Sequence, residues 1–179
     1  MFLSLFNSFA SATHSPLIVC LQDPPVWRNQ LPFFAGFLSF SPLIPNLRPR
    51  VTFYAFKSLI GMATITLIFT NRSDHATLEI SAHSLFGIKA EKFHIVNCYS
   101  VWGSTATERT VLPILALANT AFPTRVVGDL NIHHPSADPI RRHNSSALKP
   151  SFPYFSRAAE HGYRLLNAAG VYSRFPLQG

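Results

Sequence analysis

The chain has few cysteines, few charged residues and no apolar run of membrane-spanning length. Cys20 and Cys98 are the only cysteines in 179 residues, which argues against a disulfide scaffold and favours two buried thiols in a reducing compartment. Charged residues make up only 13%, so we expect an apolar surface and limited solubility. Leu59–Thr70 is too short to span a bilayer, and Met1–Phe9 lacks a basic region, so neither a membrane span nor a secretory signal is predicted.

No repeat, low-complexity tract or long linker divides the chain, so residues 1–179 are expected to form a single domain. The formal net charge is +7, from 15 Lys and Arg against 8 Asp and Glu, and the basic residues are spread from Arg28 to Arg174. This balance favours a polyanionic partner such as nucleic acid, although a basic composition alone does not require one. No obligate protein partner is evident in the sequence.

Hydrophobic patterning predicts an α/β chain. Strands are expected at residues 16–21, 51–57, 63–69, 76–80, 92–99, 125–128 and 163–167, and helices at residues 110–121 and 151–161. Gly162 would stop the second helix. Residues 26–46 are rich in Pro and Phe without clean periodicity, which predicts a long surface loop.

The most informative stretch begins with a β-branched pair. Val126 and Val127 are expected to end a buried strand, and Gly128 would let the chain turn there. Since residues i and i+2 of an extended segment point to the same side, the Asp129 carboxylate and the Asn131 amide would project together. Such oxygen donors suit a hard divalent cation. The alternative is that both are ordinary turn-forming residues.

A second acid stands at the end of another predicted strand. Asp23 follows the apolar run of residues 16–21, and acids at strand ends of one sheet can converge on one cation. The alternative for Asp23 is a turn or helix cap before Pro24. Arg48 and Arg50 could meet a phosphate or could simply be solvated.

The string Gly-Asp-Leu-Asn-Ile-His-His-Pro at residues 128–135 resembles the Gly-Asp-Phe-Asn-x-His-His-Pro segment of the endonuclease/exonuclease/phosphatase superfamily. More narrowly, it is similar to the endonuclease domain of LINE-type retrotransposons, especially the fungal-like versions. The match runs from about Leu17 to Phe175. It implies a four-layer fold, a two-sheet β-sandwich flanked by helices. The family's first strand and its closing Asp–His element have no counterpart here, so an incomplete domain is expected.

The resemblance implies metal-dependent hydrolysis of DNA phosphodiesters with Mg²⁺ or Mn²⁺. Asp23 stands where the family has a metal-binding Glu, and the Asp side chain is shorter than that Glu by one methylene. Asp129 would bind the metal and orient water, and Asn131 would hold a phosphate oxygen. Tyr99 ends a strand that matches the family's Val-Asn-x-Tyr and would line the phosphate site; the alternative is a half-buried strand tyrosine.

Other interpretations stay open. A domain without the Asp–His element could be a catalytically inactive remnant that binds nucleic acid, and a phosphatase acting on an inositol or lipid phosphate is a third reading. His133 and His134 suggest zinc, but no Cys or third His lies at ligand spacing, so they are expected to support the loop carrying Asn131. An intracellular protein with DNA as partner is the expectation.

Overall fold

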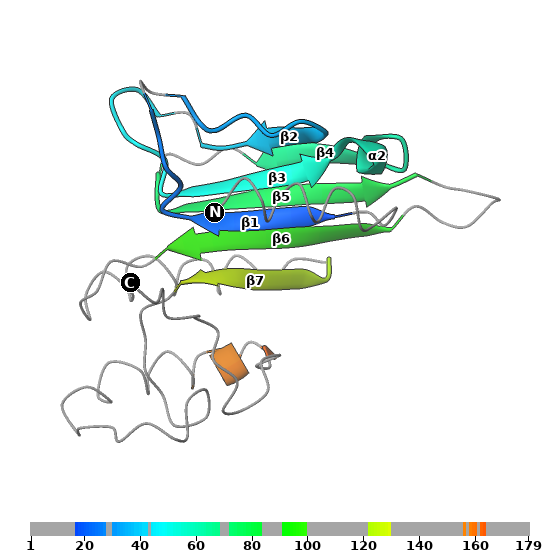
Figure 1. The fold of residues 1–179 in the computed structure, drawn as a ribbon. Helices are drawn as coiled ribbons and strands as arrows, with labels where there is room; N and C mark the ends of the chain where they lie inside the picture. Colours follow the sequence, from blue (N-terminus) through cyan, green and yellow to red (C-terminus); the bar gives the residue numbers. More distant parts are fainter. Residues whose placement is uncertain are drawn as a thin grey trace, which may run out of the picture. The chain divides into compact units, whose positions relative to one another are not determined.

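The computed structural model describes residues 17–27, 30–42, 44–68, 72–83, 91–99, 122–129, 156, 158–160 and 162–163. The chain divides into two compact units, residues 1–99 with 120–129 and residues 100–119 with 130–179. The described part is mostly β, with two sheets and only very short helices (Figure 1). Within the described segments, no helix is both long and apolar enough to cross a membrane.

Both sheets belong to the first unit. The three-stranded sheet has the antiparallel order β1 (Ile18–Gln22), β3 (Val51–Phe56), β2 (Phe37–Phe40). The four-stranded sheet has the order β4 (Ala63–Ile68), β5 (His75–Ala82), β6 (Lys92–Tyr99), β7 (Thr124–Asp129). In it β6 and β7 are parallel and the other pairs are antiparallel. A single turn of helix, α2 (Lys57–Ile60), lies between β3 and β4 in the chain.

The strands predicted at residues 51–57, 63–69, 76–80, 92–99 and 125–128 are confirmed as β3 to β7. The prediction of a loop throughout residues 26–46 is wrong, because β2 lies within it. Aromatic packing explains the difference: Phe34 and Phe37 are buried, and the Phe34 ring meets the Tyr54 ring edge-on at 4.9 Å. The helix predicted at residues 110–121 and the strand at 163–167 fall outside the described residues, apart from Tyr163.

Strand β3 is buried on both faces. Val51 and Phe53 point between the two sheets, where they join Leu78 and Ile80 of β5 in one apolar core. Tyr54 points to the other face of the three-stranded sheet and packs with Phe34 and Phe37 in a second core. The alternation of side chains along a strand therefore places one strand in two cores.

Asn97 of β6 ties the two sheets together through buried hydrogen bonds. Its Oδ1 accepts from Gln22 Nε2 at 2.6 Å, and its Nδ2 donates to the carbonyl oxygens of Leu21 at 3.0 Å and Thr52 at 2.9 Å. The side chain is fully buried. Since Gln22 and Leu21 lie on β1 and Thr52 on β3, one amide satisfies three polar groups on two strands of the other sheet.

Asn97→Ala is expected to lower the free energy of unfolding by about 3 kcal/mol, because three polar groups, one buried and two partly buried, lose their partner. Urea unfolding followed by circular dichroism measures the change. Gln22→Ala should cost less, and a double-mutant cycle with Asn97→Ala should show coupling between them. The exposed Thr66 of β4 provides a control, since Thr66→Ala should change stability by about 0.5 kcal/mol or less. A loss for Asn97→Ala no larger than the control's would contradict this role.

Cys20 and Cys98 are free thiols. Cys98 is fully buried and donates to the Val127 carbonyl at 3.4 Å, whereas Cys20 is only partly buried, so the prediction of two buried thiols holds fully for Cys98 alone. Burial raises the pKa of each thiol from 9.0 to about 12. Each thiol therefore stays protonated in the folded chain well above the pH at which it ionises in an unfolded chain.

We expect both thiols to react with a disulfide reagent at pH 8 on the order of 10²-fold or more slowly in the folded chain than in urea. Because the folded pKa values are raised, their contribution to stability is complete below pH 9 and is lost as the pH rises toward 12. Thiol titration and alkaline unfolding curves measure the two effects. Rapid labelling of Cys98 in folded protein would contradict the observed burial.

In the second unit, residues 156 and 158–160 are helical, and Gly162 follows with φ +77°. The Gly162 N–H donates to the Ala159 carbonyl and the Tyr163 N–H to the Ala158 carbonyl, both at 2.9 Å. This bonding pattern is the Schellman ending of a helix, in which glycine adopts the left-handed conformation at no steric cost. The prediction that Gly162 stops this helix is confirmed.

Candidate functional site

The carboxyl ends of three strands meet at one end of the first unit. Strands β1, β6 and β7 run in the same direction in Figure 1, and β1 contacts both β6 and β7. Asp23 follows β1, while Tyr99 and Asp129 are the last residues of β6 and β7. Arg50 lies directly before β3, whose first residue pairs with the last residue of β1. We call Asp23, Arg48, Arg50, Tyr99 and Asp129 the strand-end cluster.

Backbone hydrogen bonds hold this end together. The Asp23 N–H donates to the Arg50 carbonyl at 2.6 Å, and the Arg50 N–H donates to the Ser73 carbonyl at 2.8 Å. The Tyr99 N–H donates to the Asp74 carbonyl, also at 2.8 Å. The bend before β5 therefore joins the start of β3 to the end of β6, and thus one sheet to the other.

Asp23 forms ion pairs with two arginines. Its Oδ1 lies 3.6 Å from Arg48 Nη2 and 3.4 Å from Arg50 Nε, and the carboxylate side chain is 45% exposed. Its backbone is left-handed, with φ +45°, a conformation that Asp tolerates better than most residues. Asp23 thus turns the chain as well as carrying charge. The sequence left open whether Arg48 and Arg50 contact a phosphate or are solvated. In the structure both arginines pair with Asp23 and neutralise its charge.

Arg50 also contacts Tyr99. Its guanidinium carbon lies 4.3 Å from the centroid of the Tyr99 ring, within the range of a cation–π interaction. Arg50 Nε is buried and has no hydrogen-bond partner among the described residues, although it lies near Asp23. Tyr99 is half-buried against the core between the sheets. Arg50 consequently links the Asp23 carboxylate to the Tyr99 ring.

Asp129 pairs in register with Tyr99, and Gly128 pairs with Cys98. A Cβ atom at Gly128 would lie 1.9 Å from the Cys98 carbonyl oxygen, and φ at Gly128 is +153°. The prediction that Gly128 permits a turn after the strand is therefore wrong, because this glycine lies inside β7 and allows the close approach of β6. The negative charge of Asp129 is near enough to Cys98 to contribute to the raised pKa of that thiol, after burial and Asp74.

The prediction of a buried strand at Val126 and Val127 is also wrong. Val126 is partly buried and Val127 is 37% exposed, because β7 is the last strand of its sheet. Arg125 is exposed as well. Asp129 therefore ends an edge strand that is open on one side within the described part of the chain.

A second acidic group at this end was not singled out from the sequence. Asp74 accepts from Arg72 Nε at 3.0 Å and Arg72 Nη2 at 2.7 Å, and its Oδ1 lies 3.1 Å from His75 Nδ1. The bidentate hydrogen bond raises the pKa of Arg72. Asp74 lies between the strands predicted at residues 63–69 and 76–80, in a stretch to which the sequence assigned no role. The only sequence signal was an arginine two residues before an acid, and that spacing occurs in many turns.

The donors for a divalent cation at this end are the carboxylates of Asp23 and Asp129, which have the chemistry that Mg²⁺ prefers. Asn131, His133 and His134 lie outside the described residues. Among the residues that the structure describes, no group of three or more His, Cys, Asp or Glu side chains is arranged to hold a metal ion. A cation at Asp23 would share that carboxylate with Arg48 and Arg50.

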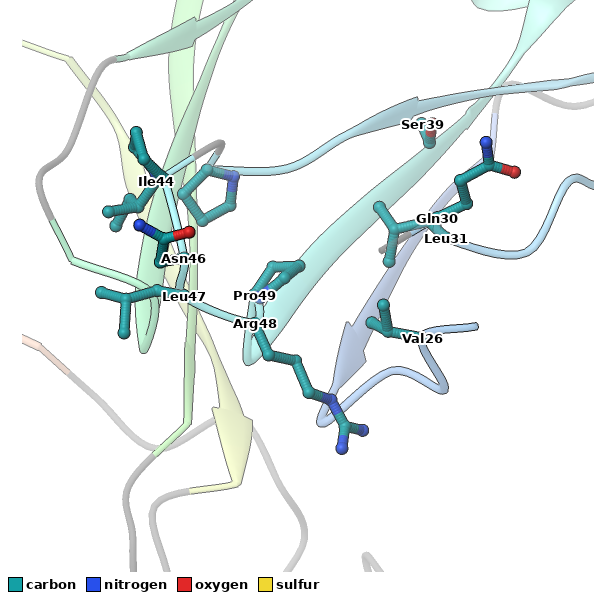
Figure 2. A pocket seen from close by; sticks show the side chains of 11 residues that line it. Val26, Gln30, Leu31, Ser39, Ile44, Asn46, Leu47, Arg48 and Pro49 are labelled. Atoms are coloured by element: carbon teal, nitrogen blue, oxygen red, sulfur yellow. The ribbon is translucent and has the colours of Figure 1, made fainter. Parts of the chain in front are cut away.

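A groove of about 970 Å³ begins at Arg48. Figure 2 shows Val26, Gln30 and Leu31 on one side, and Ile44, Asn46 and Leu47 on the other. The lining combines polar and apolar surface in similar measure, and most of the segment that forms it was expected from the sequence to be a surface loop. Because Arg48 also pairs with Asp23, the groove adjoins the strand-end cluster.

Comparison with protein-family models and with curated proteins finds no match for this chain.

Proposed function

We propose that this chain is a metal-dependent phosphodiesterase acting on DNA, an endonuclease domain of the LINE-type retrotransposon kind. The observation that supports this function best is the gathering of Asp23, Tyr99 and Asp129 at one end of the two sheets. The segment at residues 128–135 supports the same superfamily. The two observed sheets are consistent with its four-layer fold, which we propose as the finer architecture.

Each residue of the strand-end cluster has a role in this proposal. Asp129 orients the attacking water and accepts its proton, and Tyr99 lines the phosphate site. Asp23 and Asp129 hold Mg²⁺ or Mn²⁺, which when bound polarises the scissile phosphate. Asn131, two residues beyond Asp129 in the sequence, holds a phosphate oxygen.

The arginines contribute charge to the same site. Arg48 and Arg50 face one acid, Asp23, so this side of the cluster carries excess positive charge. A phosphodiester is attracted to such a surface, and guanidinium groups match the geometry of its oxygens. Arg50 is held in place by Asp23 and by the Tyr99 ring, which reduces the conformational freedom lost when it meets a phosphate.

The direct test is nicking of supercoiled plasmid DNA by the purified chain. Open circular product should accumulate at millimolar Mg²⁺ or Mn²⁺ and should vanish with a chelator. Returning the metal should restore nicking, which separates metal dependence from loss of folded protein. No nicking by folded protein at any concentration of either metal would refute the proposed hydrolysis.

A second function is favoured by one observation, the pairing of Asp23 with two arginines. These guanidinium groups compete with a cation for the carboxylate, and a chain that cannot hold the metal would bind nucleic acid without cleaving it. Binding would then weaken steeply with added salt, since phosphate contacts dominate the affinity. Salt-dependent binding together with the absence of nicking would identify this second function.

A further inference from the structure

The groove is bounded by two segments of the first unit. Val26, Gln30 and Leu31 come from the segment after β1, and the opposite wall includes residues 44–47 (Figure 2). Its volume of about 970 Å³ lies at the upper end of the ~300–1,000 Å³ that small-molecule sites occupy. Gln30, Ser39, Asn46 and Arg48 are its polar lining residues. A lining that mixes polar and apolar surface in similar measure suits a flat, partly polar ligand.

Two exposed aromatic side chains belong to the segment that forms one wall of this groove. Trp27 stands in the sequence between the lining residues Val26 and Gln30, and Phe33 follows the lining residue Leu31 by two positions. Trp27 is 77% exposed and Phe33 is 80% exposed. Trp27 follows Val26 and exchanges two backbone hydrogen bonds with Gln30, at 3.0 and 2.9 Å, so its backbone is held next to a residue that lines the groove. Phe33 precedes the buried Phe34, which anchors that segment in the second core. Large aromatic side chains held in this exposed position commonly mark an interaction surface.

The sequence that contains the groove's segments is basic. No Asp or Glu occurs between Asp23 and Asp74, whereas that stretch carries Arg28, Arg48, Arg50, Lys57 and Arg72. Arg48 lines the groove and also belongs to the strand-end cluster. The groove therefore has exposed aromatic side chains on one bounding segment and an arginine at the end that adjoins the proposed phosphate site. This combination suits single-stranded nucleic acid.

We propose that this groove binds the unpaired bases of a single-stranded DNA segment adjoining the strand-end cluster, with Trp27 and Phe33 stacking on bases and Arg48 contacting the backbone phosphate. The inference rests on the proposed function, because it takes the strand-end cluster as the phosphate site. It adds a preference for single strands. In a duplex the base faces are stacked on each other, so they cannot meet Trp27 or Phe33.

The test titrates a fluorescein-labelled oligodeoxythymidine, alone and paired with its complement, against the Asp129→Ala chain, which prevents cleavage. Trp27→Ala and Phe33→Ala, each added to that background, should weaken single-strand binding by about 5- to 150-fold, the range that base stacking contributes. Phe122→Ala is the matched control, because Phe122 is a partly exposed aromatic that contacts His94 and Lys92 away from the groove. Circular dichroism verifies the fold of each variant.

A second measurement does not depend on substitution of the aromatic residues. Trp102→Phe leaves Trp27 as the single tryptophan, whose fluorescence should be quenched when the oligonucleotide stacks on it. Unchanged Trp27 emission at saturating oligonucleotide, unchanged binding in both aromatic variants, or a preference for duplex would each overturn the inference. If the wild-type chain still nicks plasmid in that case, the proposed function survives and only the groove assignment fails. Aromatic-dependent binding by a chain that never nicks would support the groove and refute hydrolysis.

Discussion

Gly128→Ala is expected to lower the free energy of unfolding by about 3 kcal/mol or more, and to abolish nicking. An added Cβ would lie 1.9 Å from the Cys98 carbonyl oxygen, a backbone atom, so β7 must move away from β6. The φ of +153° adds strain for any residue with a side chain. Because β7 carries Asp129, this displacement would also misplace the acid. Urea unfolding and amide hydrogen exchange in β6 and β7 measure the two effects.

Two other glycines separate the causes of that loss. Gly162 has φ +77° but open space at its Cβ, so Gly162→Ala isolates the backbone strain and should cost about 1 kcal/mol. Gly61 has an ordinary φ of −69°, and its Cβ would meet only the Ser58 carbonyl at 3.7 Å, so Gly61→Ala should be close to neutral. If all three variants unfold alike, the close contact between β6 and β7 is not what restricts position 128.

Asp129→Asn is expected to reduce plasmid nicking by on the order of 10²–10⁴-fold. The substitution keeps the size of the side chain and removes the negative charge that would hold a cation and accept a proton. Initial rates of nicking at saturating Mg²⁺ provide the measurement, with circular dichroism to verify the fold. Single-strand binding should persist, since the charge removed is negative.

Glu91→Gln is the matched control for Asp129→Asn. Glu91 is an exposed acid beside the first residue of β6, at the opposite end of that strand from Tyr99. Its loss removes the same charge from the chain and leaves the strand-end cluster intact. Nicking should therefore be unchanged. Equal losses in the two variants would indicate a general effect of charge, and an undiminished rate in Asp129→Asn would remove this residue from the proposed mechanism.

The sequence predicted most of the strands because their patterns are local. In β5, for example, Ala76, Leu78 and Ile80 alternate with less buried residues, and this alternation is visible without a structure. Strand β2 was missed because its burial depends on Tyr54, which lies far along the chain and supplies the surface that Phe34 and Phe37 cover. The exposure of β7 was missed because the β-branched pair Val126 and Val127 is equally compatible with a central strand and with an edge strand.

The candidate site shows the same division. The gathering of Asp23 and Asp129 could be expected, because acids at the ends of similarly directed strands lie at one end of a fold. The arginine partners of Asp23 could not be assigned, since they depend on how the segment before β3 passes β1. The buried hydrogen bonds of Asn97 likewise join residues that lie far apart in the sequence.

Strand β3 has a consequence for how the first unit comes apart. Its side chains alternate between the core that joins the sheets and the core beneath Phe34 and Phe37. A shift of β3 by one residue in register would exchange the side chains on its two faces. Val51 and Phe53 would then face the core under Phe34 and Phe37 instead of the core between the sheets. Displacement of β3 would therefore disrupt both cores at once. Unfolding of the core between the sheets is therefore coupled to unfolding of the core under Phe34 and Phe37 through β3, which both cores share.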